Sequence, residues 1–187
     1  MSAALSGGLV GGFSGAGLVG VSAVNKATGI GVGIGTWLGG GVVVQGVGSG
    51  LGGAGVMSGS VIFEYGVSVG LVSGALKSAG VVGVMAERLA VGVVTGIMGV
   101  PHVVVGSSAG VGSGIFTGGV LGDAVSLEGA LRLGLSSQGI AGLYPLEVSG
   151  LAAGINLMYG ASVVTGSIVG AGSGAVSGVP VLGKILV

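Results

Sequence analysis

The sequence predicts an all-α protein, a polytopic bundle of about five transmembrane helices that pack through glycine. The first observation is charge: of 187 residues, only five are basic and five acidic, whereas ordinary domains contain about 25% charged residues. The second is the mean hydropathy of +1.11, which leaves too few polar groups to cover a surface facing water. The third is the repetition of glycine at every fourth residue, a spacing that lets membrane helices approach closely.

The composition also excludes several classes of protein. Disorder requires low hydrophobicity and high net charge, and the net charge here is zero. The 49 glycines keep no strict period of three and only three prolines are present, so the chain is not collagen. Five basic residues balanced by five acids make no phosphate-binding surface, so no nucleic-acid partner is expected. The absence of cysteine excludes disulfides.

The charged residues divide the chain into uncharged stretches, and a membrane helix needs about 20 apolar residues. Lys26 separates the first two stretches, Lys77 ends the third, and Arg88 precedes the fourth. The five expected spans are 3–24, 28–49, 54–76, 89–113 and 139–160. Residues 161–187 form a further span or a tail, and residues 1–187 form one integral membrane domain. The charges are too few to fix its orientation.

Glycine ladders within these spans predict the faces through which helices dock. The spacing of four places each set on one helix face, where small residues favour close crossings. Replacing Gly110 or Gly114 by leucine should then disrupt assembly. A shorter ladder is Gly66, Gly70 and Gly74. The candidate packing residues are Gly106, Gly110, Gly114, Gly118, Gly166, Gly170 and Gly174.

The alternative fold is a glycine-rich β assembly. Residues Gly29–Gly35 and Gly46–Gly50 alternate with a period of two, which is the period of a strand. Valine is also more frequent than leucine, and β-branched residues suit strands. This interpretation predicts a stacked-sheet fibre.

Three polar side chains fall within the apolar spans and are candidates for a proton relay: Glu64, His102 and Glu147. A carboxylate within a bilayer is costly and by default indicates a functional site. His102 follows Pro101, where a helix would kink and free a carbonyl group. The alternative is that each side chain caps a helix, reaches the interface or lines a helix contact.

Patterns for self-contained catalysis are missing. The single aspartate is Asp123, and glycine-rich matches such as Gly48–Gly53 lack the strand–helix setting and the acidic residue of a dinucleotide site. No cofactor or metal ion is therefore expected, and catalysis by the chain alone is not expected. The expected partners are the lipid bilayer and other membrane subunits of a complex.

Three segments resemble subunit 6 of mitochondrial NADH:ubiquinone oxidoreductase. Met1–Leu5 with Gly17–Ser22 is similar to the first helix of that family and its exit. Tyr65-Gly66, followed by an apolar run, is similar to its third helix, and Leu143–Val148 with Gly154–Gly160 to its last. Where the family has a second glycine in the third helix, this chain has Val67.

This resemblance implies a non-catalytic subunit of the mitochondrial inner membrane whose third helix helps to couple quinone chemistry to proton pumping. For any proton-coupling subunit of a respiratory or rotary complex, Glu64 is the first residue to test. Two other resemblances imply a structural or channel-forming subunit. Gly35–Gly41 and Gly92–Gly96 look like the glycine-rich helices of inner-membrane translocase channels. The spans around Glu64 and Glu147 look like the two halves of a rotary-ATPase proteolipid.

Overall fold

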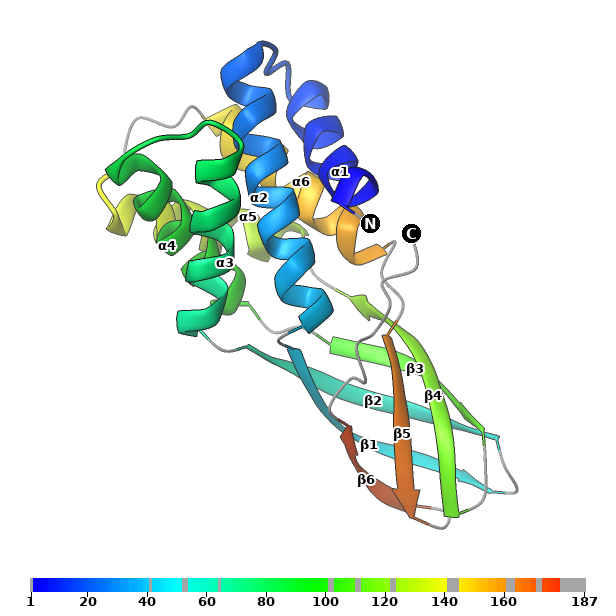
Figure 1. Cartoon of the computed structure of the whole chain (residues 1–187). Coiled ribbons are helices and arrows are strands. Elements are labelled where there is room, and N and C mark those ends of the chain that lie inside the picture. Colours follow the sequence, from blue (N-terminus) through cyan, green and yellow to red (C-terminus); the bar gives the residue numbers. More distant parts are fainter. Residues whose placement is uncertain are drawn as a thin grey trace.

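The computed structural model combines a helical body with an antiparallel sheet that extends from one end of it (Figure 1). It describes residues 2–40, 42–51, 54–63, 65–100, 103–109, 112–121, 124–140, 145–160, 164–170 and 173–178. Within these residues the helices are α1 (Ser2–Gly15), α2 (Val21–Gly40), α3 (Tyr65–Ser78), α4 (Val84–Met98), α5 (Ala124–Ser137) and α6 (Pro145–Gly160). The strands are β1 (Val42–Leu51), β2 (Ala54–Phe63), β3 (Val103–Ala109), β4 (Gly112–Leu121), β5 (Val164–Gly170) and β6 (Ser173–Gly178).

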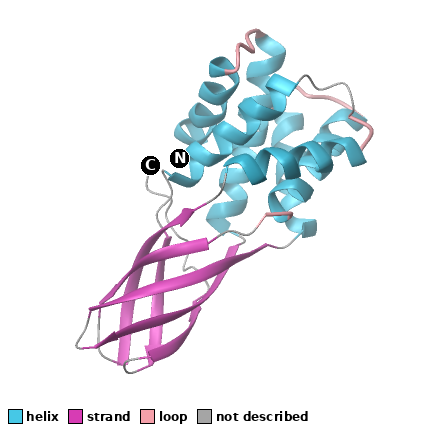
Figure 2. Cartoon of the chain, turned by 180° about the vertical axis from the view of Figure 1, so that it is seen from behind, coloured by secondary structure: helices cyan, strands magenta, loops and turns pink. Residues whose placement is uncertain are grey.

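The order of these elements is a threefold repeat. Two helices are followed by two strands, and the pattern then recurs twice along the described chain. The sheet order is β5-β4-β3-β2-β1-β6, and every pair is antiparallel. The β1–β2 hairpin runs in register from Val42 opposite Phe63 to Leu51 opposite Ala54. The helices group together beyond one end of the sheet, as the reverse view also shows (Figure 2).

The first and last strands of the sheet, β5 and β6, are consecutive in the chain. Gly170 ends β5 and Ser173 begins β6, and a residue spans at most about 3.6 Å. The adjoining ends of the two edge strands must therefore lie close together. The sheet curves accordingly, and β6 pairs with β1 at the edge opposite β5.

A glycine cap ends the first helix of each repeat. Gly17, Gly80 and Gly139 have φ values of 78°, 89° and 70°, a left-handed conformation that costs other residues about 1–2 kcal/mol. In each case the amide of the next residue donates to a carbonyl five residues earlier: Leu18 to Phe13, Val81 to Leu76 and Ile140 to Leu135. These bonds are the Schellman motif, and they turn the chain back into the second helix.

The second helix of each repeat carries two glycines, four residues apart, that receive the first helix of a neighbouring repeat. Added Cβ atoms at Gly29 and Gly33 would lie 2.7 and 2.5 Å from the Cα atoms of Leu76 and Val72. Carbon atoms rest about 3.5–4.0 Å apart, so only glycine permits this approach of α2 to α3. The equivalent glycines are Gly92 and Gly96, which seat α5 on α4, and Gly150 and Gly154, which seat α1 on α6.

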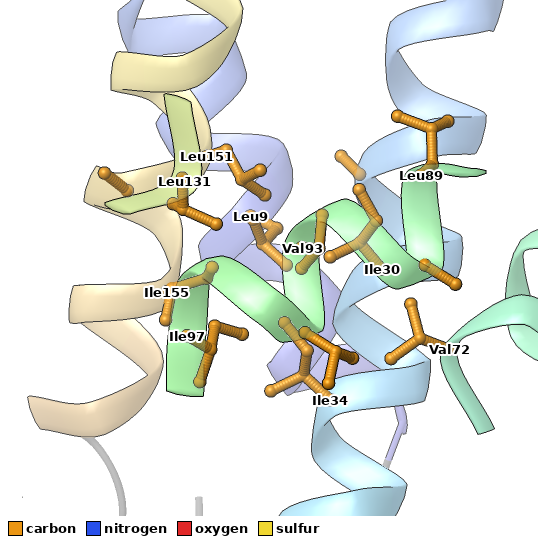
Figure 3. Packing of buried hydrophobic residues seen from close by; sticks show 14 of the residues in the cluster. Leu9, Ile30, Ile34, Val72, Leu89, Val93, Ile97, Leu131, Leu151 and Ile155 are labelled. Carbon is orange, nitrogen blue, oxygen red and sulfur yellow. The ribbon is translucent and has the colours of Figure 1, made fainter. Parts of the chain in front are cut away.

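The core fills the space between the six helices (Figure 3). The second helices contribute equivalent side chains, such as Ile34, Ile97 and Ile155, each fully buried. Leu9 and Leu131 come from equivalent positions of two first helices and are fully buried as well. The three helix pairs therefore share one apolar core. Burying each such side chain contributes about 1.5–3 kcal/mol to the stability of the fold.

The prediction of a helical bundle is therefore confirmed in part, whereas the sheet lies outside the all-α class. The span predicted at 28–49 covers α2 and then β1, and the span at 54–76 covers β2 and then α3. The span at 89–113 similarly ends in strand β3, and residues 161–187 contain β5 and β6. Among the helices of the described ranges, none combines the length and the apolar character that a membrane crossing requires.

Most of the predicted glycine ladders lie on strands rather than helices, and this assignment was wrong. Gly106 is in β3, Gly114 and Gly118 are in β4, Gly166 and Gly170 are in β5, and Gly174 is in β6. Gly110 lies outside the described residues. The shorter ladder of Gly66, Gly70 and Gly74 does lie on helix α3, but added Cβ atoms there would meet nothing within 4 Å. Close helix packing uses the paired glycines of the second helices instead.

Candidate functional site at the apolar end of the bundle

Five exposed apolar side chains gather at the turns that join α1 to α2 and α3 to α4. We call this set the apolar end, and its members are Val19, Val21, Val82, Val84 and Met85, which are 84%, 77%, 77%, 62% and 48% exposed. The two turns lie on the side of the helical body away from the sheet (Figures 1 and 2). Exposed apolar patches mark interaction sites, so this end is the candidate functional surface.

The exposure follows from the local sequence. The turns read Gly17-Leu18-Val19-Gly20-Val21 and Gly80-Val81-Val82-Gly83-Val84, and Gly20 and Gly83 have positive φ values of 118° and 70°. Leu18 and Val81 follow the cap glycine and pack against the core. The next residues, Val19 and Val82, lie between two left-handed glycines and remain in solvent. The repeat therefore places equivalent valines at one end of the bundle.

A pocket of about 480 Å³ opens between these two turns. Its walls are Val21, Val81, Val82 and Met85, with Gly80 between them. Its polar lining comes from the first turns of α2: Ser22, Asn25 and Lys26. Ligand pockets commonly have volumes of about 300–1,000 Å³ and combine apolar walls with a few polar groups. This hollow, which is widely open to solvent, matches such pockets in its volume and its mixed lining.

Lys26 also joins two distant parts of the chain. Its Nζ donates to Glu147 Oε1 on α6 at 3.2 Å, and the side chains are 25% and 14% exposed. Lys77 and Glu87 form a second ion pair at 3.0 Å beside the α3–α4 turn, with both side chains half exposed or more. Arg132 and Glu128 form a third along α5 at 2.9 Å. Exposed pairs of this kind contribute about 0–1 kcal/mol each to stability. The Lys26–Glu147 pair is the most buried of these three, so it is the one that we expect to stabilise the contact between helices.

The three candidates for a proton relay have different outcomes. Glu64 and His102 lie outside the described residues. Glu147 is in the first turn of α6 and holds Lys26, an arrangement that matches the alternative in which it makes a contact between helices. The relay itself stays a prediction, and its test is given below.

Sequence reasoning did not identify the pocket residues. Lys26 served only as a boundary between two spans, and Asn25, Val82 and Met85 were not singled out. The signal was present in the two turns, since Ala16–Val21 and Ala79–Val84 are nearly the same sequence. Internal repetition of that kind predicts equivalent structural units. It would have placed both turns at the same end of the bundle.

Within the part of the chain that the structure describes, no group of three or more His, Cys, Asp or Glu side chains could hold a metal ion. Comparisons with protein-family models, with curated proteins and with solved structures found no match.

Proposed function

We propose that the chain is a non-catalytic structural subunit that attaches to a membrane through the apolar end of its helical bundle. The observation that carries this proposal is the exposure of Val19, Val21, Val82, Val84 and Met85 together. Amphipathic elements bind a bilayer interface by burying such side chains about 5–10 Å deep. The zero net charge and the scarcity of charged residues also favour an apolar environment over water.

The charges near this end are compatible with an interface. Lys26, Lys77 and Arg88 lie one or two helical turns from the exposed valines, and Lys77 and Arg88 are exposed. Their long side chains can reach toward head groups while the valines enter the apolar region. Glu87 and Glu147 pair with two of these bases, so attachment would depend mainly on apolar burial.

Binding to lipid vesicles tests this proposal. We expect the double variant Val19→Asp/Val82→Asp to lose most of its vesicle binding, because both new carboxylates would have to enter the interface. The matched control is Val125→Asp, because Val125 is 80% exposed in the first turn of α5, which follows the sheet strand β4. Equal binding by the double variant and the wild type would contradict the proposed orientation. Failure of the wild type to bind any vesicle would contradict the function itself.

A further inference from the structure

We infer that the pocket between the α1–α2 and α3–α4 turns binds one anionic phospholipid, with the phosphate at Lys26 and Asn25 and an acyl chain along Val21, Val82 and Met85. This inference rests on the proposed membrane attachment and adds the class of lipid that is recognised. Its basis is the composition of the pocket, whose lining combines Lys26 and Asn25 with an apolar wall of Val21, Val82 and Met85.

The head-group end of the pocket has donors for a phosphate. An ammonium group carries three protons and an amide nitrogen carries two. Glu147 Oε1 accepts one hydrogen bond from Lys26 at 3.2 Å, so the same nitrogen can donate to a second acceptor. Gly80 leaves room for the amide, because a Cβ atom there would lie 3.3 Å from Asn25 Nδ2.

The apolar wall of the pocket would contact the acyl chain of the lipid. Val82 and Met85 both line the pocket and belong to the exposed apolar end. An acyl chain lying on them would therefore pass directly from the pocket into the bilayer. A small anion such as inorganic phosphate would leave these side chains uncovered, which is why the complementarity favours a lipid.

The Lys26–Glu147 pair makes a sharp test possible, because the two side chains act on an anion in opposite ways. We expect Lys26→Gln to lower the affinity for vesicles containing an anionic phospholipid by about ten-fold, the effect of losing one hydrogen bond to a charged group. Glu147→Gln should raise that affinity, because it removes the carboxylate that competes with the lipid phosphate. Both effects should be smaller on vesicles of zwitterionic lipid alone, because the headgroup cation beside that phosphate offsets its charge.

Lys77 and Glu87 provide matched controls, since they form an ion pair at the same end of the bundle but are not among the residues that line the pocket. Lys77→Gln and Glu87→Gln should each change the affinity less than two-fold. Equal losses for Lys77→Gln and Lys26→Gln would show general surface attraction and overturn the inference. Losses for both Lys26→Gln and Glu147→Gln, with equal drops in thermal stability, would show a purely structural ion pair and overturn it as well.

The outcomes separate this inference from the proposed function. Wild-type binding that is independent of the anionic lipid, but lost in Val19→Asp/Val82→Asp, would overturn the lipid site and leave membrane attachment standing. Absence of binding to either type of vesicle would overturn both. Preference for anionic vesicles, with opposite effects of Lys26→Gln and Glu147→Gln, would support both.

Discussion

Replacing Gly33 with alanine tests whether the paired glycines of the second helices hold the bundle together. The added Cβ would lie 2.5 Å from Val72 Cα and 3.1 Å from Val72 Cγ2, whereas carbon atoms rest about 3.5–4.0 Å apart. The nearest atom belongs to the backbone of α3, so no rotation of a side chain can relieve the contact. Helices α2 and α3 must therefore separate by about 1 Å.

The magnitude follows from two opposing effects of Gly33→Ala. Overpacking of a core contact costs about 1–3 kcal/mol, and alanine favours the helix by up to about 1 kcal/mol relative to glycine. We expect a net loss of about 1–2 kcal/mol in the free energy of unfolding. For a domain of this size the midpoint of thermal unfolding should fall by about 2–8 °C, as measured by circular dichroism.

The matched control for this prediction is Gly70→Ala on the partner helix α3. A Cβ atom at Gly70 would meet nothing within 4 Å, so only the gain in helix propensity remains. We expect this variant to be more stable than the wild type by about 0.5–1 kcal/mol. If Gly33→Ala were stabilised to the same extent, the close approach of α2 to α3 would be wrong, and with it the packing of the three repeats.

Three further predictions concern the contact of α1 with α6, the glycine turns and proton coupling. The chain has no cysteine, and a Cβ at Gly8 would lie 3.8 Å from Leu157 Cβ, the mean separation in a disulfide. The oxidised variant Gly8→Cys/Leu157→Cys should therefore run as a cross-linked monomer on a non-reducing gel, and a cross-linked dimer would contradict closure of α1 on α6 within one chain. Gly80→Ala should destabilise the fold by about 1 kcal/mol in urea unfolding, because φ is +89° there, and an unchanged midpoint would contradict the glycine cap. If Glu64 relays protons, Glu64→Gln should abolish proton uptake by the reconstituted complex without preventing assembly, whereas full uptake would exclude that role.

The sequence predicted the presence of helices better than their limits, and glycine explains the difference. Gly29–Gly35 alternates with a period of two yet lies in helix α2, whereas Gly106 and Gly114 belong to a ladder with a period of four yet lie in strands. With 49 glycines in 187 residues, either period arises without a structural cause. Hydropathy does not separate the states here either, because the apolar run of 28–49 continues from helix α2 into strand β1.

The candidate site depends on contacts that no local pattern contains. The turn around Gly80 can be predicted from its likeness to the turn around Gly17, and both have the positive φ that such a cap requires. The pocket is different, because it exists only where the turn at Gly80 lies against the start of α2. Lys26 and Glu147 meet across 121 residues of sequence, and their contact follows from the packing of both α2 and α6 against α1 rather than from spacing.

The repeat determines how the helices pack, and differences between equivalent positions of the repeat determine which side chains line the pocket. Equivalent positions of the three second helices, three residues before the first of the two packing glycines, are occupied by Lys26, Leu89 and Glu147. Leu89 is only 3% exposed and belongs to the core, where an unpaired ammonium would be costly. A lysine is tolerated at this position in α2 because the equivalent residue of α6 is an acid that pairs with it. The same pair that makes Lys26 structurally acceptable involves a residue that lines the pocket, which is why its two members should have opposite effects on an anionic lipid.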